Sequence, residues 1–96
     1  MDLGSIIKNI RKQKGLTQIE FASSCGITQT YLSQIESNQK EPNLSTLKNI
    51  SNNLNIPLPI LFFLSMTAED VQPNKREAFE IVSPSVKSLV NEFFSV

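Results

Sequence analysis

The stretch TQIEFASSCGITQTYLSQIE, residues 17–36, contains the signals of two short helices joined by a tight turn. Thr17 and Glu20 have the T-x-x-E spacing of a capping box, which satisfies two free backbone N–H groups at the start of a helix. Gly26 suits the left-handed backbone conformation that ends such a helix. Thr28 belongs to the residue types that cap the start of the next helix. The stretch therefore predicts a helix-turn-helix motif, whose second helix reads DNA.

The second helix of this motif separates apolar from polar side chains. Ile27, Leu32 and Ile35 supply its apolar side. Four amide or hydroxyl side chains are left to point outward: Gln29, Thr30, Ser33 and Gln34. Side chains of these kinds can hydrogen-bond to base edges in the major groove. Within the motif we favour base contacts over the alternative that these are ordinary exposed polar residues.

Apolar residues at helical spacing predict further helices on both sides of the motif. The five expected helices cover about 2–14, 18–25, 29–37, 45–55 and 59–65. Ser45 is the expected N-cap of the fourth helix. Asn38 and Asn55 are expected in the left-handed conformation, which asparagine tolerates at helix ends. No segment alternates in the manner of a strand, so we expect an all-α fold.

Residues 67–96 form a separate helical extension in this interpretation, and residues 1–66 form the helix-turn-helix domain. A short helix is expected at about 74–82, with Ala78, Phe79 and Val82 facing inward. Ser83 and Pro84 then resemble an N-cap followed by proline at the first helical position. The final helix that they begin has apolar residues at i, i+3, i+4 and i+7. These residues are Val86, Leu89, Val90 and Phe93.

The charge distribution is uneven although the formal net charge is zero. A zero net charge alone argues against a nucleic-acid-binding protein. However, residues 1–66 contain six basic and four acidic residues, whereas residues 67–96 contain three basic and five acidic residues. Four of the basic residues lie together in the first helix: Lys8, Arg11, Lys12 and Lys14. Such a cluster beside a DNA-reading motif can neutralise phosphates.

Several function classes lack support in the sequence. The chain has no histidine and one cysteine, Cys25, so neither a zinc site nor an internal disulfide is expected. There is no pairing of nucleophile and base and no glycine-rich phosphate loop, so we expect a non-enzyme without cofactors. The longest apolar run, Ile60 to Leu64, is too short for a membrane span. No signal-peptide pattern is present, so we expect a cytoplasmic protein.

Residues 6–62 resemble the lambda-repressor-like helix-turn-helix family, also called the XRE family. The matching segments are IIKNIRKQKGLTQIEFA, GITQTYLSQIES and EPNLSTLKNISNNLNI. The resemblance implies a five-helix bundle in which the helix at 29–37 enters the major groove. It also implies a dimer that binds two half-sites about one DNA turn apart. The extension 67–96 lies outside the resemblance.

The resemblance also assigns roles to individual residues. It implies base contacts for Gln29, Thr30, Ser33 and Gln34, and DNA backbone contacts for Arg11, Gln18 and Asn43. It pairs Arg11 with Glu36, which joins the first helix to the end of the reader helix. Three further candidates for backbone contact come from their residue types and positions: Thr28, Tyr31 and Lys40. From the residues themselves, Thr28 is first a cap, and solvation of Lys40 is favoured over DNA contact unless its loop lies along the DNA. Tyr31 can reach a phosphate or pack on the fourth helix.

Two apolar surfaces of the expected helices have no evident cover. They are expected to form a dimer or partner interface and comprise Ile60, Phe63 and Leu64 with Val86, Leu89, Val90, Phe93 and Phe94. Mutual burial within the chain, across a two-fold axis, or both would explain them. We favour a shared dimer interface, because symmetric operators need a symmetric protein.

The function expected from these features is sequence-specific binding of double-stranded DNA by a transcriptional regulator, as a homodimeric repressor. Two alternatives stay open. In the first, the chain is an antitoxin-type module whose residues 67–96 hold a protein partner. In the second, it controls a restriction–modification system or a mobile element.

Overall fold

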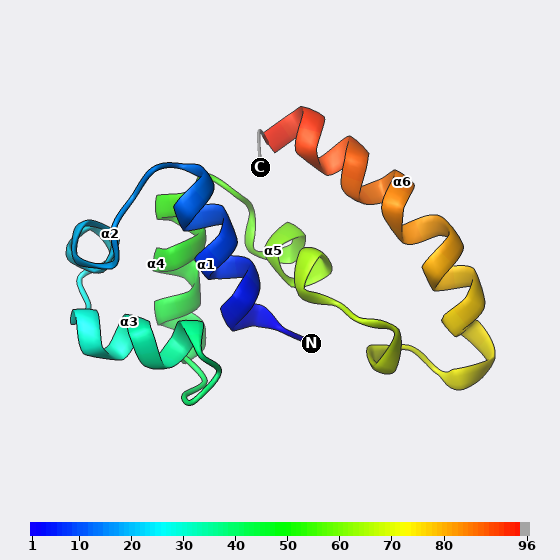
Figure 1. Ribbon diagram of the computed structural model, residues 1–96, viewed down its shortest axis with the longest axis horizontal. Coiled ribbons are helices and arrows are strands. Elements are labelled where there is room, and N and C mark those ends of the chain that lie inside the picture. The colour runs from blue at the N-terminus through cyan, green and yellow to red at the C-terminus, as the bar shows by residue number, and fades with distance from the viewer. Residues whose placement is uncertain (95–96) are drawn as a thin grey trace.

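The computed structural model describes residues 1–94, and helices dominate this part of the chain (Figure 1). The helices are α1 (Leu3–Gln13), α2 (Gln18–Cys25), α3 (Gln29–Glu36), α4 (Leu44–Leu54), α5 (Leu58–Ser65) and α6 (Arg76–Phe94). Two 3-10 turns, η1 (Ala68–Asp70) and η2 (Pro73–Lys75), connect α5 to α6. No strand occurs between residues 1 and 94, which confirms the all-α prediction.

The local signals of the helix-turn-helix motif form the structures that they predict. The Thr17 hydroxyl accepts from the Glu20 N–H, and the Glu20 carboxylate accepts from the Thr17 N–H, both at 3.1 Å. Gly26 ends α2 with a φ of 69°. The Thr28 hydroxyl accepts from the Tyr31 N–H at 3.1 Å and so caps α3. These contacts fix both ends of the turn between α2 and α3.

The N-cap prediction for α4 is wrong by two residues. Asn43, and not Ser45, caps the helix, because the Asn43 side-chain oxygen accepts from the Thr46 N–H at 2.8 Å. Asn43 has the extended backbone conformation that an N-cap requires. The two predicted left-handed residues are confirmed, since Asn38 has a φ of 62° and Asn55 a φ of 57°.

The prediction of two helices in the extension is also wrong. Helix α6 is continuous from Arg76 to Phe94 and includes Pro84, so Ser83 does not cap a new helix. Proline removes one backbone donor, but the less exposed side chains of α6 stay on one face of the helix across it. They include Phe79, Ser83, Val86, Val90 and Phe94. Of the residues expected to face inward from 74–82, Phe79 is half-buried, whereas Ala78 and Val82 are exposed.

The core lies where α1, α2, α3, α4 and α5 meet. Helix α1 packs on α3 and α5, α2 packs on α3 and α4, and α4 packs on α5. The largest fully buried apolar side chains are Ile7, Phe21, Leu32, Ile35, Ile50, Leu54, Ile56 and Leu61. Cys25 is buried with them, and burial raises the pKa of its thiol to about 11. The thiol is therefore protonated at neutral pH and fills space as a small apolar group.

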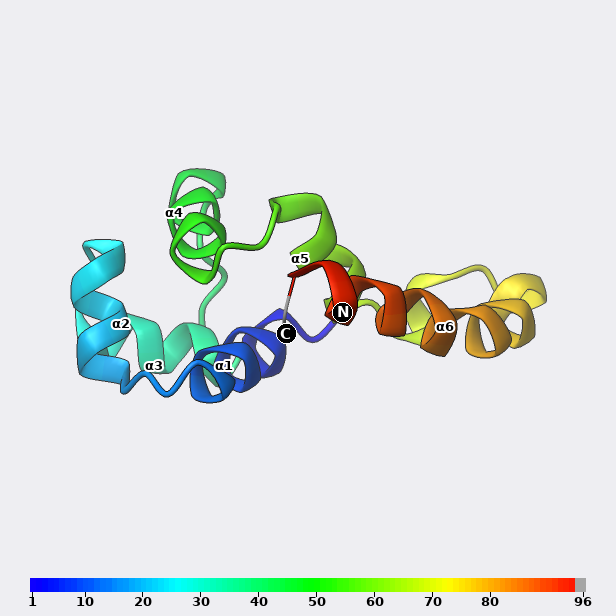
Figure 2. The ribbon, with the colours of Figure 1, turned by 90° about the horizontal axis from the view of Figure 1, so that it is seen from above.

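Helix α6 packs on η1 and η2 near its N-terminus, and its C-terminal half reaches the core of α1 to α5. Figures 1 and 2 place α2 and α3 at one end of the molecule and the first half of α6 at the other. Val90 is buried in the core cluster, and Phe94 lies beside Ile56 and Pro57. The Met1 amine forms an ion pair of 2.8 Å with Asp70, which ties η1 to the start of α1.

The start of α1 is joined closely to the end of α3. A Cβ atom at Gly4 would collide with the Ile35 carbonyl oxygen, so only glycine permits this approach. The Gly4 N–H donates to the Asn38 side-chain oxygen at 3.0 Å. The Asn38 amide nitrogen in turn donates to the Asp2 carboxylate at 2.7 Å. This bond from Asn38, with further bonds from Ser5, lowers the pKa of Asp2.

Arg11 and Glu36 form a buried ion pair between α1 and α3. Arg11 Nε donates to Glu36 Oε2 at 2.7 Å, and Arg11 Nη2 donates to Glu36 Oε1 at 2.9 Å. The remaining guanidinium nitrogen, Nη1, donates to the Leu16 carbonyl at 2.7 Å. Gln18 Nε2 also donates to Glu36 Oε1, at 3.0 Å. Each of the two charged residues is 5% exposed.

This geometry predicts strong coupling between Arg11 and Glu36. Arg11→Met or Glu36→Gln alone leaves the other charge buried without its partner, which costs about 3–5 kcal/mol of unfolding free energy. The double variant should lose much less unfolding free energy than the two single variants lose together. A double-mutant cycle by urea unfolding should give a coupling well above the ~0.2–1 kcal/mol of exposed pairs.

The control for this cycle combines Arg11→Met with Glu80→Gln, a change at an exposed carboxylate on α6. Those two effects should be additive. Additive effects of Arg11→Met and Glu36→Gln would contradict the role given to the pair.

A second prediction concerns pH and the bond between Asn38 and Asp2. Asn38→Gly keeps the left-handed conformation but removes the amide that lowers the pKa of Asp2. A lowered folded-state pKa stabilises the fold above the ordinary aspartate pKa of about 4, and this contribution disappears as the pH falls through the lowered value. The stability difference between the native chain and Asn38→Gly should therefore shrink between about pH 7 and about pH 3.

Asn55→Gly is the matched control, because Asn55 has the same left-handed conformation. Between residues 1 and 94, no carboxylate accepts a hydrogen bond from the Asn55 side chain. The difference in unfolding free energy between the native chain and Asn55→Gly, measured by urea unfolding, should not change with pH. The same pH profile for both variants would show that Asp2 does not titrate through Asn38.

Candidate nucleic-acid interface

Helix α3 is held at both ends and presents one free face. Its first turn is capped by Thr28, and its last residue, Glu36, is bound by Arg11. Leu32 and Ile35 are buried against the core. The opposite side of α3 is therefore displayed in a fixed orientation at one end of the molecule (Figure 1).

The free face of α3 forms one wall of a shallow polar hollow. Its lining residues are Gln18, Gln29, Thr30, Ser33, Gln34 and Gln39. The structure thus brings the four expected base-reading side chains together with Gln18 from the start of α2. Gln29, Thr30 and Ser33 are exposed, and Gln34 is half-buried. All six side chains end in an amide or a hydroxyl, so the hollow is rich in both hydrogen-bond donors and acceptors.

Gln39 is a lining residue that was not predicted from the sequence. The left-handed conformation of Asn38 turns the chain back on the last turn of α3. As a result, the N–H groups of Gln39 and Lys40 both donate to the Gln34 carbonyl, at 2.9 Å and 3.2 Å. A left-handed residue at a helix end turns the next residue back beside that helix. The expected left-handed conformation of Asn38 could therefore have predicted that Gln39 lies beside α3.

The residues expected at the DNA backbone have different environments. Thr28, Lys40 and Asn43 are exposed. Tyr31 is half-buried and packs against the core, which favours the packing alternative for its ring. Gln18 is half-buried and already bonded to Glu36.

Arg11 differs from the other backbone candidates because its guanidinium is buried and bonded on all three nitrogens. The role of Arg11 in the interface is therefore to position α3 through Glu36. A direct contact of Arg11 with phosphate stays a prediction that this burial does not favour.

Positive charge near the interface comes from lysines. Lys8, Lys12 and Lys40 are exposed, and Lys14 is half-buried. Glu20 is an exposed acidic residue of the motif, and hydrogen bonds from Thr17 lower the pKa of its carboxyl. No cluster of His, Cys, Asp and Glu suited to a metal ion occurs among the described residues. None of their helices is long and apolar enough to cross a membrane.

Comparison with known proteins agrees with this geometry. The helix-turn-helix family profile matches residues 7–61, more than half of the chain. The immF control region 10 kDa protein of Bacillus phage phi105 is 42% identical over 59 residues, which are 62% of this chain and 66% of that protein. The immunity repressor protein of the same phage is 39% identical over 56 residues, which are 58% of this chain and 39% of that protein. The chain thus spans less than two thirds of either relative.

A solved structure of a mutant of the restriction–modification controller protein C.Esp1396I has the same fold over the motif. Its TM-score is 0.61 at 28% identity, over 66% of this chain and 82% of that chain. The segment that the family profile matches contains the capped turn between α2 and α3 and the free face of α3. All three observations indicate a helix-turn-helix motif. The chain belongs to the XRE-type helix-turn-helix family of DNA-binding transcription regulators.

Proposed function

We propose that this regulator binds double-stranded DNA sequence-specifically as a homodimer and represses transcription by covering a promoter. The observation that carries the proposal is the hollow on α3, in which five amide or hydroxyl side chains surround Gln29. Such side chains pair with base edges, and a glutamine amide can form two hydrogen bonds with adenine. The proposal assigns the chain no catalytic step and no cofactor.

The contacts divide into base reading and backbone positioning. Gln29, Thr30, Ser33 and Gln34 are the proposed base readers, because they share one exposed face of a rigid helix. Thr28, Lys40 and Asn43 are exposed around this face and would meet phosphates. Backbone contacts fix the register of the protein on the duplex and carry no sequence information directly.

Homodimerisation through α6 is the second part of the proposal. Apart from Ile81, which is 70% exposed, the apolar residues of α6 lie on two adjacent faces. Val90 is buried and Val86 and Phe94 are half-buried on the face toward the domain. On the neighbouring face, Leu89 is 54% exposed and Phe93 is 77% exposed. Intrachain packing thus accounts for the first face and leaves the second without cover.

We define the outer stripe of α6 as Ala78, Val82, Ser85, Leu89 and Phe93. These residues are exposed and recur at intervals of four, three, four and four, which places them along one side of the helix. Ala78 and Ser85 are small and would allow a second α6 to approach closely. A second copy of the chain would bury this stripe and supply the two-fold symmetry that a palindromic site requires. Ile60 and Phe63 are half-buried on α5, and Leu64 is buried in the core, so α5 offers less free surface than expected.

A second candidate function has support from one comparison. The solved structure described above is of a protein named as a restriction–modification controller. The same DNA-reading face would serve such a controller, which both activates and represses. Activation requires contact with polymerase besides DNA, so transcription measured on one promoter with graded amounts of protein separates the two functions.

The readout prediction concerns Gln29. Gln29→Ala should weaken binding to the preferred site by about 1–3 kcal/mol and relax specificity at one or two base pairs. The side chain is exposed, so the unfolding free energy should hardly change. Gln72→Ala, at an exposed glutamine between η1 and η2, should bind like the native chain. If Gln29→Ala lost the same affinity for preferred and random duplexes, Gln29 would not read bases.

The assembly prediction concerns Leu89. Leu89→Glu introduces a charge into the outer stripe and should convert the dimer into a monomer in sedimentation equilibrium. The monomer should bind a half-site only weakly, because one reader helix buries little surface. Asn91→Glu adds the same charge at an exposed position outside the stripe and should leave the dimer intact. A dimer that survives Leu89→Glu, or a native chain that is monomeric, would rule out the outer stripe as the interface.

A further inference from the structure

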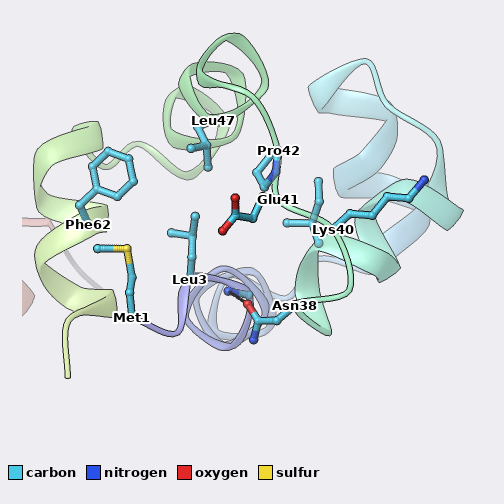
Figure 3. Close-up of a pocket in the computed structure, with 10 residues that line it drawn as sticks. Met1, Leu3, Asn38, Lys40, Glu41, Pro42, Leu47 and Phe62 are labelled. Carbon is cyan, nitrogen blue, oxygen red and sulfur yellow. Dashed lines mark hydrogen bonds between the residues drawn. The ribbon is translucent and has the colours of Figure 1, made fainter. Parts of the chain in front are cut away.

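A cavity of about 500 Å³ lies between the start of α1, the α3–α4 loop, α4 and α5. Figure 3 shows it with its lining side chains. The apolar part of the lining comes from segments far apart in the sequence and comprises Met1, Leu3, Ile35, Pro42, Leu47 and Phe62. This volume falls within the range of roughly 300–1,000 Å³ that small-molecule pockets have in proteins. The cavity is separate from the polar hollow on α3, since the two share no lining residue.

One carboxylate of the lining, that of Glu41, lies beside these apolar side chains and is exposed to solvent. Figure 3 shows the Glu41 carboxylate between Leu3 and Leu47, whereas the Lys40 side chain extends away from the cavity. No ion pair of Glu41 occurs within residues 1–94, where the two ion pairs are Met1–Asp70 and Arg11–Glu36. Of the two cations that belong to lining residues, the Met1 amine is paired with Asp70, and Lys40 forms no ion pair with Glu41. The cavity thus combines apolar walls with a negative charge that has no counter-charge.

We propose that this cavity binds a small organic ammonium ion and that the bound ion weakens DNA binding. The ammonium group would form a charge-assisted hydrogen bond with Glu41. An apolar body of the size of a phenyl ring would fill the space between Leu3, Leu47 and Phe62. An anion would meet the Glu41 charge, and a neutral apolar molecule would leave it without a partner, so the cavity selects a cation.

The link to DNA binding runs through the α3–α4 loop, residues 37–43, and rests on the proposed function. The loop has the cavity on one side and the polar hollow on the other. Gln39 and Lys40 donate to the Gln34 carbonyl, and Glu41 follows directly. A cation that draws Glu41 toward the cavity would pull on this connection and move Gln34, Gln39 and Lys40. The affinity for DNA would fall because these side chains lie on the reading face or beside it.

The test uses 2-phenylethylammonium as the probe on the full chain without DNA. Titration followed by ¹H–¹⁵N NMR should give saturable shifts at Leu3, Gly4, Asn38 and Glu41. Glu41→Gln keeps the size of the side chain but removes its charge, and it should lower the affinity for the probe about tenfold. Glu80→Gln, an exposed carboxylate on α6, should bind the probe like the native chain. The matched anion 3-phenylpropionate and the neutral 2-phenylethanol should bind much more weakly.

Three results would overturn the proposed site. They are shifts that do not saturate, equal binding to Glu41→Gln, and equal binding of 3-phenylpropionate. The regulatory half is tested by measuring DNA affinity first without and then with saturating probe. We expect the probe to weaken DNA binding at least tenfold in the native chain and not in Glu41→Gln. An unchanged DNA affinity with the probe bound would overturn the link, whereas absence of DNA binding before the probe is added would instead contradict the proposed function.

Discussion

The buried ion pair between Arg11 and Glu36 is the interaction on which the reading geometry depends. It joins α1 to the last residue of α3, and its two side chains also bind the Leu16 carbonyl and Gln18 at the start of the motif. Four segments thereby meet at one buried site. Removing two charges from water is costly and is offset only when the remaining donors and acceptors are satisfied. Here no buried side-chain polar atom of residues 1–94 lacks a partner. The pair thus positions α3 so that its polar face stays directed outward.

The parts of the fold that could be predicted from sequence depend on contacts within a few residues. The Thr17 capping box, the Thr28 cap and the left-handed residues Gly26 and Asn55 each bond a neighbour along the chain. Their residue types therefore identify them without knowledge of the tertiary structure. The four α3 residues of the polar hollow followed in the same way, because helical spacing decides which residues of α3 share a face.

The features that could not be predicted depend on competition or on distant packing. Asn43 and Ser45 are both good caps two residues apart, and the extended backbone of Asn43 decides between them. Pro84 resembles a helix start, yet α6 continues through it, and the half-buried Phe79 and the buried Val90 on either side share one face of the helix. The cavity near Glu41 collects residues from both ends of the α1–α5 domain, and no local pattern indicates their meeting. The division of α6 into a covered and an exposed apolar face likewise depends on where the helix lies (Figure 2).

The proposed mechanism requires a symmetric pair of α3 helices to read one DNA sequence. Selection of bound sites from random duplex DNA by the full chain is the most direct experiment on this requirement. We predict enrichment of a two-fold symmetric sequence whose half-sites are centred about 10 base pairs apart, one turn of DNA. Enrichment of an asymmetric single site would contradict the dimer, and no enrichment over the starting pool would contradict sequence-specific reading by α3.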